Sequence, residues 1–177
     1  MASVTYGNAV RGLKDLKVTN IAGSSQEDLG AATMLEAKPV LDSDILVGDD
    51  AVKAAVSYPT HLEWSITNGE FSSAALAIMT GITLATSGST PNEITEFQMN
   101  ESVRFPYFKV YGQALDEGVG DFHVLIWKCK IQELGSIAKL ENGNWRVNEI
   151  SGVALNDSTH GLFEVIQHET AAAVPTS

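Results

Sequence analysis

The feature of this sequence that most constrains its fold is the alternation of side chains over residues 122–133. One face of this segment would carry His123, Leu125, Trp127, Cys129 and Ile131, and the other would carry Phe122, Val124, Ile126, Lys128, Lys130 and Gln132. A period of two is typical of a β-strand. Because the second face changes from apolar to basic, we expect this strand to be buried on both sides at its start and to meet water at its end.

Most of the remaining chain also has the pattern of strands. We predict them at residues 16–21, 32–41, 51–56, 61–67, 94–99, 107–111, 137–140, 145–155 and 161–170. The turn-rich segment 116–121 predicts a hairpin before the strand at 122, and the Asn142-Gly143 pair predicts a second one. Residues 23–30 and 87–92 have the composition of loops, and Pro59 and Pro106 are expected to end strand pairing.

A single segment, residues 70–80, has helical periodicity. Its apolar positions follow the i, i+3, i+4, i+7 spacing and are Phe71, Ala74, Ala75 and Ile78. We expect Asn68 to cap the start, Glu70 to favour the positive end of the helix dipole, and Gly81 to supply a left-handed stop. The sequence therefore predicts a mainly β fold, a sandwich or barrel, with one α-helix packed on it through these four side chains.

Acidic residues dominate the charge of the chain. There are 22 Asp and Glu against 11 Lys and Arg, a formal net charge of −11. This balance argues against a surface built to grip phosphates or anionic lipid. The start of the chain is locally basic, with Arg11, Lys14 and Lys17 against Asp15. These three bases are candidates for a subunit interface beside the acidic stretch 18–50, although two solvated faces explain the pattern equally well.

Length and composition fit one globular domain over residues 1–177, with an N-terminal arm at about 1–15 and a short, mobile C-terminal tail at about 171–177. The longest apolar run, 74–79, is far shorter than the ~20 residues of a membrane-spanning helix. The start of the chain lacks a secretory pattern, and Cys129 is the lone cysteine. We therefore expect synthesis in a reducing cytoplasm without membrane insertion.

Catalytic and metal-binding signatures are absent from the sequence. None of the four histidines, His61, His123, His160 and His168, lies two to four residues from another. Neither GxSxG nor GxxxxGK occurs, and Cys129 has the position of an inert core thiol. We therefore expect no cofactor, no metal and no enzymatic activity. The aromatic residues Phe105, Tyr107, Phe108 and Tyr111 suit an interface or a core equally well.

The order of these segments resembles a known family. The match covers roughly residues 30 to 170. It consists of a strand, a helix ending in glycine, and further strands that end with a closing strand. The segments that carry it are 61–67, 71–81, 105–112, 124–130, 145–155 and 161–170. In this order the sequence resembles the tail tube (major tail) proteins of long-tailed bacteriophages. A small β-fold enzyme, with an acid such as Glu96 in the site, is a weaker alternative.

The resemblance implies a structural protein of the virion tail. Its hexameric rings stack into a hollow tube, with an inner β-barrel, an outer helix, and termini and an extended loop that lock ring to ring. The implied partners are further copies of the chain, the tape measure and terminator proteins, and double-stranded DNA as non-specific cargo. The candidate inter-ring loop holds Asp42, Asp44, Asp49 and Asp50. The alternative is a non-polymerising β-sandwich that binds to or decorates a virion, and inner tubes of contractile tails are close neighbours.

Overall fold

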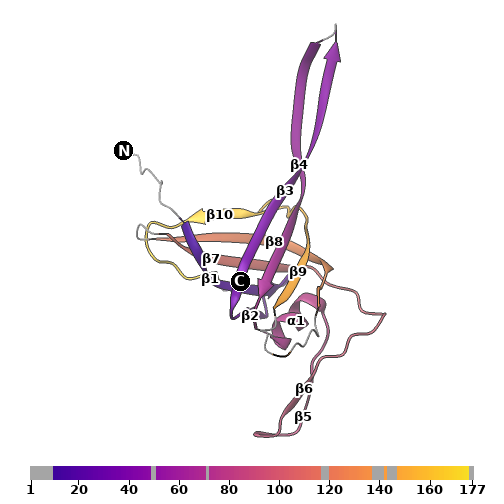
Figure 1. The fold of residues 1–177 in the computed structure, drawn as a ribbon, viewed down its shortest axis with the longest axis vertical. Helices are drawn as coiled ribbons and strands as arrows, with labels where there is room; N and C mark the ends of the chain where they lie inside the picture. Colours follow the sequence, from indigo (N-terminus) through magenta and orange to yellow (C-terminus); the bar gives the residue numbers. More distant parts are fainter. Residues whose placement is uncertain are drawn as a thin grey trace.

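The computed structural model describes residues 10–48, 51–70, 72–116, 120–136, 142 and 147–175. Within them, one antiparallel sheet dominates, with strand order β2-β1-β7-β8-β9-β4-β3 and with β10 paired to β8 (Figure 1). The strands of this sheet are β1 (Val10–Asn20), β2 (Gln26–Asp28), β3 (Ala32–Gly48), β4 (Ala51–Asn68), β7 (Phe108–Asp116), β8 (Asp121–Glu133), β9 (Asn148–Ala154) and β10 (Glu164–Gln167). The predicted mainly β class with one helix, α1 (Ser73–Thr80), is confirmed.

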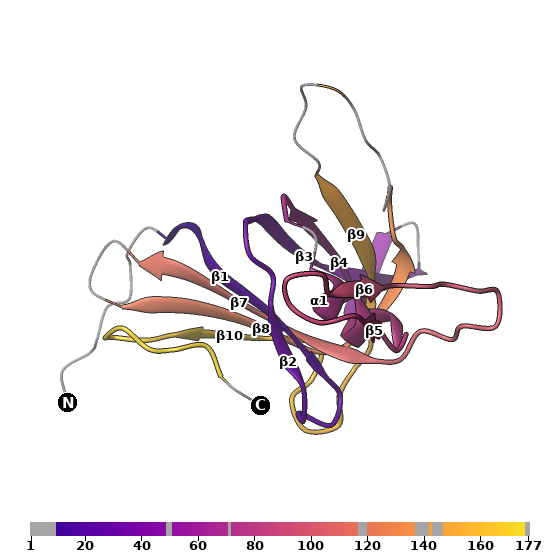
Figure 2. The ribbon, with the colours of Figure 1, turned by 90° about the horizontal axis from the view of Figure 1, so that it is seen from below.

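The sheet curls so that its two ends face each other across the main core. Leu35 of β3 lies against Gly112 of β7, whose missing side chain leaves room for it, and Leu16 of β1 adjoins the same point. Because these strands are far apart in the strand order, this contact closes the sheet into a sandwich-like shell (Figure 2). The buried side chains inside the shell include Leu16, Val18, Leu62, Trp64, Ile66, Phe108, Val110, Ile126 and Cys129.

One extra residue in β8 changes which side chains reach the main core. Val110 pairs with Ile126, but Phe108 pairs with Cys129, so three residues of β8 span two of β7. Such a bulge reverses the faces of every later residue in its strand. The prediction that His123, Leu125, Trp127, Cys129 and Ile131 share one face is therefore wrong. Cys129 and Ile131 join Ile126 in the main core, whereas Leu125 and Trp127 pack in a smaller cluster.

The helix starts later than predicted and presents a different face. Ser72 is its N-cap, with its side-chain oxygen accepting a hydrogen bond from the Ala75 N–H at 3.2 Å. Asn68 instead accepts from the Glu70 N–H, and the first helical turn contains no acid, so both predicted roles at the helix start are wrong. Gly81 ends the helix with a φ of 72°, as expected.

The helix face in the core was only partly predicted. Ala75 is fully buried and Ile78 packs against the core from a half-buried position, while Ala74 is half-buried and Phe71 lies outside the described residues. The additional buried helix residues are Leu76, Met79 and Thr80. In such a short helix, rotation by part of a turn changes which side chains are buried.

Several predicted strand limits also need correction. The predicted strands at 51–56 and 61–67 form one strand, β4, in which Pro59 pairs opposite Leu41 without ending the ladder. The supposed loop 23–30 contains β2, and the predicted arm over 1–15 contains the start of β1 from Val10. Residues 94–99 shorten to β6 (Ile94–Glu96), which pairs with β5 (Ala85–Ser87). The predicted strand at 137–140 and the turn at Gly143 lie outside the described residues.

Gly152 offers a test of the packing between β8, β9 and β4. A Cβ there would meet the Lys130 carbonyl oxygen and would lie 2.8 Å from Trp64 Cζ2. We predict that Gly152→Ala lowers the free energy of unfolding by about 1–3 kcal/mol, measured by denaturant titration, because the methyl group forces the strands apart. The matched control is Ser151→Ala on the same strand, and equal stability of both variants would contradict the packing argument.

Candidate functional site

A two-stranded arm projects from the body of the molecule. The strand β9 pairs with β4 only from Leu62 to Asn68, whereas β3 and β4 stay paired as far as Gly48 and Ala51. The pairs from Leu41–Pro59 outward therefore form a ribbon with no third strand (Figure 1). At ~3.3 Å for each residue, this ribbon reaches about 25 Å beyond the sheet.

The arm exposes large apolar side chains on both of its faces. Seven such residues are each between 50% and 65% exposed: Leu41, Ile45, Leu46, Val47, Val52, Val56 and Tyr58. A two-stranded ribbon is only marginally stable in water, and a large exposed apolar patch usually marks a contact surface. The arm is therefore the part of the described chain with the clearest need for a partner.

The predicted inter-ring acids belong to this arm and not to an irregular loop. Asp42 and Asp44 lie within β3, and the Tyr58 hydroxyl donates a hydrogen bond to Asp42 Oδ2 at 3.1 Å. Asp42 pairs opposite Tyr58 and Asp44 opposite Val56, so these four side chains share one face. We call them the acidic arm face. Asp49 and Asp50 lie outside the described residues.

The predicted basic interface residues lie together on β1, where acids of the same chain contact two of them. Lys17 forms an ion pair with Asp15 at 3.2 Å, and Lys14 lies 4.0 Å from Asp121. Arg11 pairs with Leu115 of β7 in the same ladder. The charges of Lys14 and Lys17 are thus partly balanced within the subunit, which weakens the case for a role at an interface.

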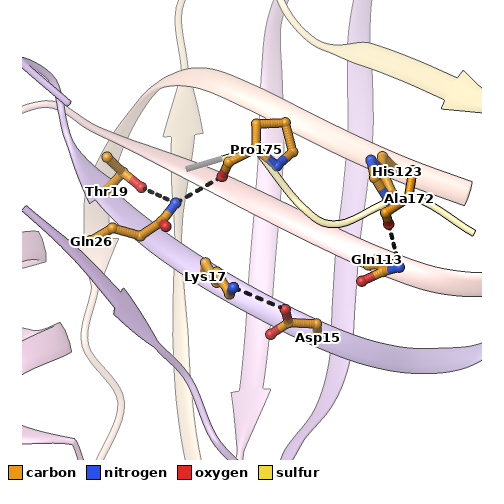
Figure 3. Close-up of polar contacts among 8 residues, drawn as sticks. All are labelled: Asp15, Lys17, Thr19, Gln26, Gln113, His123, Ala172 and Pro175. Atoms are coloured by element: carbon orange, nitrogen blue, oxygen red, sulfur yellow. Dashed lines mark hydrogen bonds and ion pairs between the residues drawn. The ribbon is translucent and has the colours of Figure 1, made fainter. Parts of the chain in front are cut away.

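The C-terminal segment packs against the sheet, contrary to the predicted mobile tail. The Ala172 N–H donates to Asp121 Oδ2 at 2.7 Å, and Gln113 Nε2 donates to the Ala172 carbonyl oxygen at 3.0 Å. Farther along, Gln26 Nε2 donates to the Pro175 carbonyl oxygen at 3.0 Å (Figure 3). Val174 is 3% exposed and belongs to the smaller cluster. We call residues 171–175 the tail clasp.

The smaller cluster under the tail clasp is rich in aromatic and ionisable groups. The rings of Tyr111 and Trp127 meet edge to face, with their centroids 5.5 Å apart, and the Trp127 ring stacks on the His160 ring with centroids 3.8 Å apart. Burial, with the nearby Glu164 carboxylate, raises the pKa of Tyr111 to about 12. His160 Nδ1 in turn lies 2.7 Å from Glu164 Oε1. These groups hold one another and the tail in place, and His160 and Glu164 are only half-buried.

Two grooves flank the base of the arm. One, of about 440 Å³, is mainly apolar and includes Pro39, Leu41, Pro59 and Phe163 in its wall. The other, of about 360 Å³, is polar and includes Glu36, Lys38, Glu63 and Ser151. Glu36 and Glu63 are both exposed. Glu96, the acid named for an enzymatic site, is exposed in β6 and lines neither groove.

The described residues contain no group of three or more His, Cys, Asp or Glu side chains placed to hold a metal ion. Burial raises the pKa of the Cys129 thiol well above its ordinary value, so it is a protonated core side chain. No helix in the described ranges is long and apolar enough to cross a membrane. No protein-family profile matches the sequence, and no curated protein is significantly similar to it.

Sequence reasoning missed the arm and the tail clasp for different reasons. The repeated β-branched and apolar residues on both sides of Asp49-Asp50 are a signal for one long hairpin, which the expectation that Pro59 ends strand pairing obscured. The tail clasp rests on Gln113 and Asp121, polar residues that are buried at 4% and 1% exposure by tertiary contacts alone. No local pattern identifies such residues.

His123 predicts a pH dependence of stability. It is 1% exposed, its Nε2 lies 3.2 Å from the Ala172 carbonyl oxygen, and its Nδ1 has no hydrogen-bond partner. Burial, followed by the nearby His168, holds the pKa of His123 below its ordinary 6.5. The unfolded chain therefore binds the proton first, so this contribution to stability is complete above pH 6.5 and is lost as the pH falls toward the folded-state pKa.

We predict that His123→Gln, which keeps a donor for Ala172, removes part of the fall in unfolding free energy on acidification from pH 7. Denaturant titrations at a series of pH values measure it. The control is His61→Gln at the base of the arm, which should leave the slope unchanged. An identical slope in the wild type and His123→Gln would show that His123 takes no part.

Proposed function

We propose that this chain is a structural protein whose copies assemble through the arm into stacked hexameric rings, forming a tail tube of the bacteriophage type. The observation that carries this proposal is the arm itself, a ribbon with seven exposed apolar side chains that no other part of the described chain covers. The resemblance in segment order supports the hexameric arrangement. The mainly β fold with a single helix is the one that this resemblance leads us to expect.

The reach of the arm favours a second copy as its partner. Because the ribbon points away from its own sheet, no other element of the described chain lies against its outer pairs, and a second molecule is free to cover them (Figure 1). A contact between the arm and a different surface of an identical chain is heterologous, and heterologous contacts repeat into rings or filaments. A contact between two arms would stop at a dimer, which would leave the remaining surfaces of the body unused.

The shape of the molecule suits stacking along the arm. The arm lies at one end of the long axis, and the hairpin formed by β5 and β6 lies at the opposite end (Figure 1). Both strands of this second hairpin are exposed, and Ile94 in it is 57% exposed. Copies arranged in the same direction would place the arm of one beyond its own ring, toward the next.

The charge of the chain suits DNA as cargo rather than as a bound ligand. A net charge of −11, repeated in every subunit, repels phosphates and keeps the duplex from adhering to the wall. In this proposal the mature protein lies in the virion tail after synthesis in the host cytoplasm. Its other partners are the tape measure protein inside the tube and the terminator at its end.

Electron microscopy of the purified chain tests the proposal directly. We predict rings or filaments at raised concentration for the wild type, and at least about a tenfold lower polymer yield for Ile45→Lys/Leu46→Lys, because two charges on the arm oppose its burial. Circular dichroism should show the same folded monomer. The control pair Val147→Lys/Val165→Lys changes the charge equally at residues that are 54% and 50% exposed on the body.

A wild-type chain that stays monomeric under all conditions would reject the tube and favour the non-polymerising binding module. Polymers that form equally well from the arm variant would keep a tube but would remove the arm as its basis.

A further inference from the structure

Three lysines of β7 and β8 gather around two aromatic rings, Tyr107 just before β7 and Trp127 in β8. The Lys109 ammonium lies 5.4 Å from the centroid of the Trp127 ring. The ammonium groups of Lys128 and Lys130 lie 5.2 Å and 5.0 Å from the centroid of the Tyr107 ring. We call Tyr107, Lys109, Trp127, Lys128 and Lys130 the basic aromatic patch.

The bulge in β8 creates this patch. Cys129 and Ile131 face the main core after the bulge, so Lys128 and Lys130 turn to the opposite side of the sheet. Trp127 precedes Lys128 in the strand and lies on that same side of the sheet, where it packs with the smaller cluster. The extra residue thus places two lysines and Trp127 on one face, where a regular strand would separate them.

The positive charge of the patch has little compensation within the chain. Among the described residues, no carboxylate lies within ion-pairing distance of Lys109, Lys128 or Lys130, unlike Lys17 with its Asp15. The pKa of Asp157 is lowered chiefly by the backbone N–H groups of Thr159 and His160 and only then by Lys128. In a chain of net charge −11, an uncompensated group of lysines favours an anionic partner.

We propose that the basic aromatic patch binds the acidic arm face of a second copy of this chain. Asp42 and Asp44 supply carboxylates for the lysines, and Val56 and Tyr58 supply apolar and aromatic surface for the ring of Tyr107. The four arm side chains share one face of a ribbon, so all of them can meet one surface at once. This inference rests on the proposed function and names the surface that receives the arm.

A second copy fits the patch better than a nucleic acid does. Three lysines on a chain with twice as many acids as bases form a small basic area, whereas duplex DNA is bound by extended basic surfaces. The arm has matching features at the same scale. Its residues 41–58 carry four acids and one base, with Val56 60% exposed beside them.

A charge swap tests the assignment. Lys128→Glu/Lys130→Glu and, separately, Asp42→Lys/Asp44→Lys should each raise the protein concentration needed for polymers about tenfold or more, measured by sedimentation and electron microscopy. The chain with all four substitutions should recover polymers near the wild-type concentration, since it restores opposite charges. Added salt should narrow the differences in this threshold between the wild type and the charge variants, because salt screens exposed pairs. Melting curves of each monomer verify that it is folded.

The possible outcomes separate this inference from the proposed function. If the wild type polymerises and Lys128→Glu/Lys130→Glu polymerises at the same concentration, the patch assignment is wrong while the tube stands. If the fourfold variant, like both double variants, does not form polymers near the wild-type concentration, the pairing of these two surfaces is also wrong. If fluorescence polarisation shows that the lysine variant loses binding to duplex DNA but still polymerises, the patch is a nucleic-acid site. A wild type that never polymerises overturns both proposals.

Discussion

The backbone ladder between β3 and β4 is the interaction on which the rest of this molecule depends. Over the body of the protein, this ladder belongs to a sheet whose inner face is buried, and side-chain packing supports it. Beyond Leu41 and Pro59 the same ladder continues without a third strand or a core, so backbone hydrogen bonds are its main support. The two halves of one hairpin thus serve different purposes: one closes the core, and the other offers surface to a partner.

A proline does not have to end a strand, and Pro59 does not end β4. Pro59 lacks an N–H donor, yet a strand can lose one donor and remain paired through its neighbours. The ladder shifts by one residue between Val40 and Leu41 at this point, which gives the chain a bend where the arm leaves the sheet. A rule that ends pairing at every proline divides β4 into two strands and conceals the arm.

How far the sequence predicts the structure depends on the range of the interactions involved. The strand at 122–126, the left-handed stop at Gly81 and the mainly β class follow from local patterns that tertiary contacts left unchanged. The bulge at Trp127 and Lys128 does not, because nothing local distinguishes a regular strand from one with an extra residue. That single residue decides which of Cys129 and Lys128 faces the core, and the side chains as far as Ile131 follow, where a second register shift begins.

The tail clasp and the acids of the arm show the same limit. Gln113 and Asp121 are buried because the C-terminal segment returns to the sheet more than 50 residues later and uses them as hydrogen-bond partners. Asp42 and Asp44 look like loop residues by composition, but cross-strand pairing with Val56 and Tyr58 holds them in β3. An acidic composition correctly predicts that these side chains are exposed to solvent, but it wrongly predicts that their backbone is a loop.

The same arrangement explains how a strongly acidic chain can associate with itself. Repulsion between subunits of charge −11 opposes assembly at every distance, whereas the burial of apolar arm side chains acts only in contact, at roughly 25 cal/mol for each Å². A contact that balances these two terms must combine apolar area with local charge of the opposite sign. The arm offers area and acid together. Lys128 and Lys130 offer positive charge over the ring of Tyr107, and among the described residues no carboxylate forms an ion pair with them. The arm of one subunit is repelled by most of the surface of another, which is acidic, but it is attracted by the basic aromatic patch. This contrast makes the docking specific.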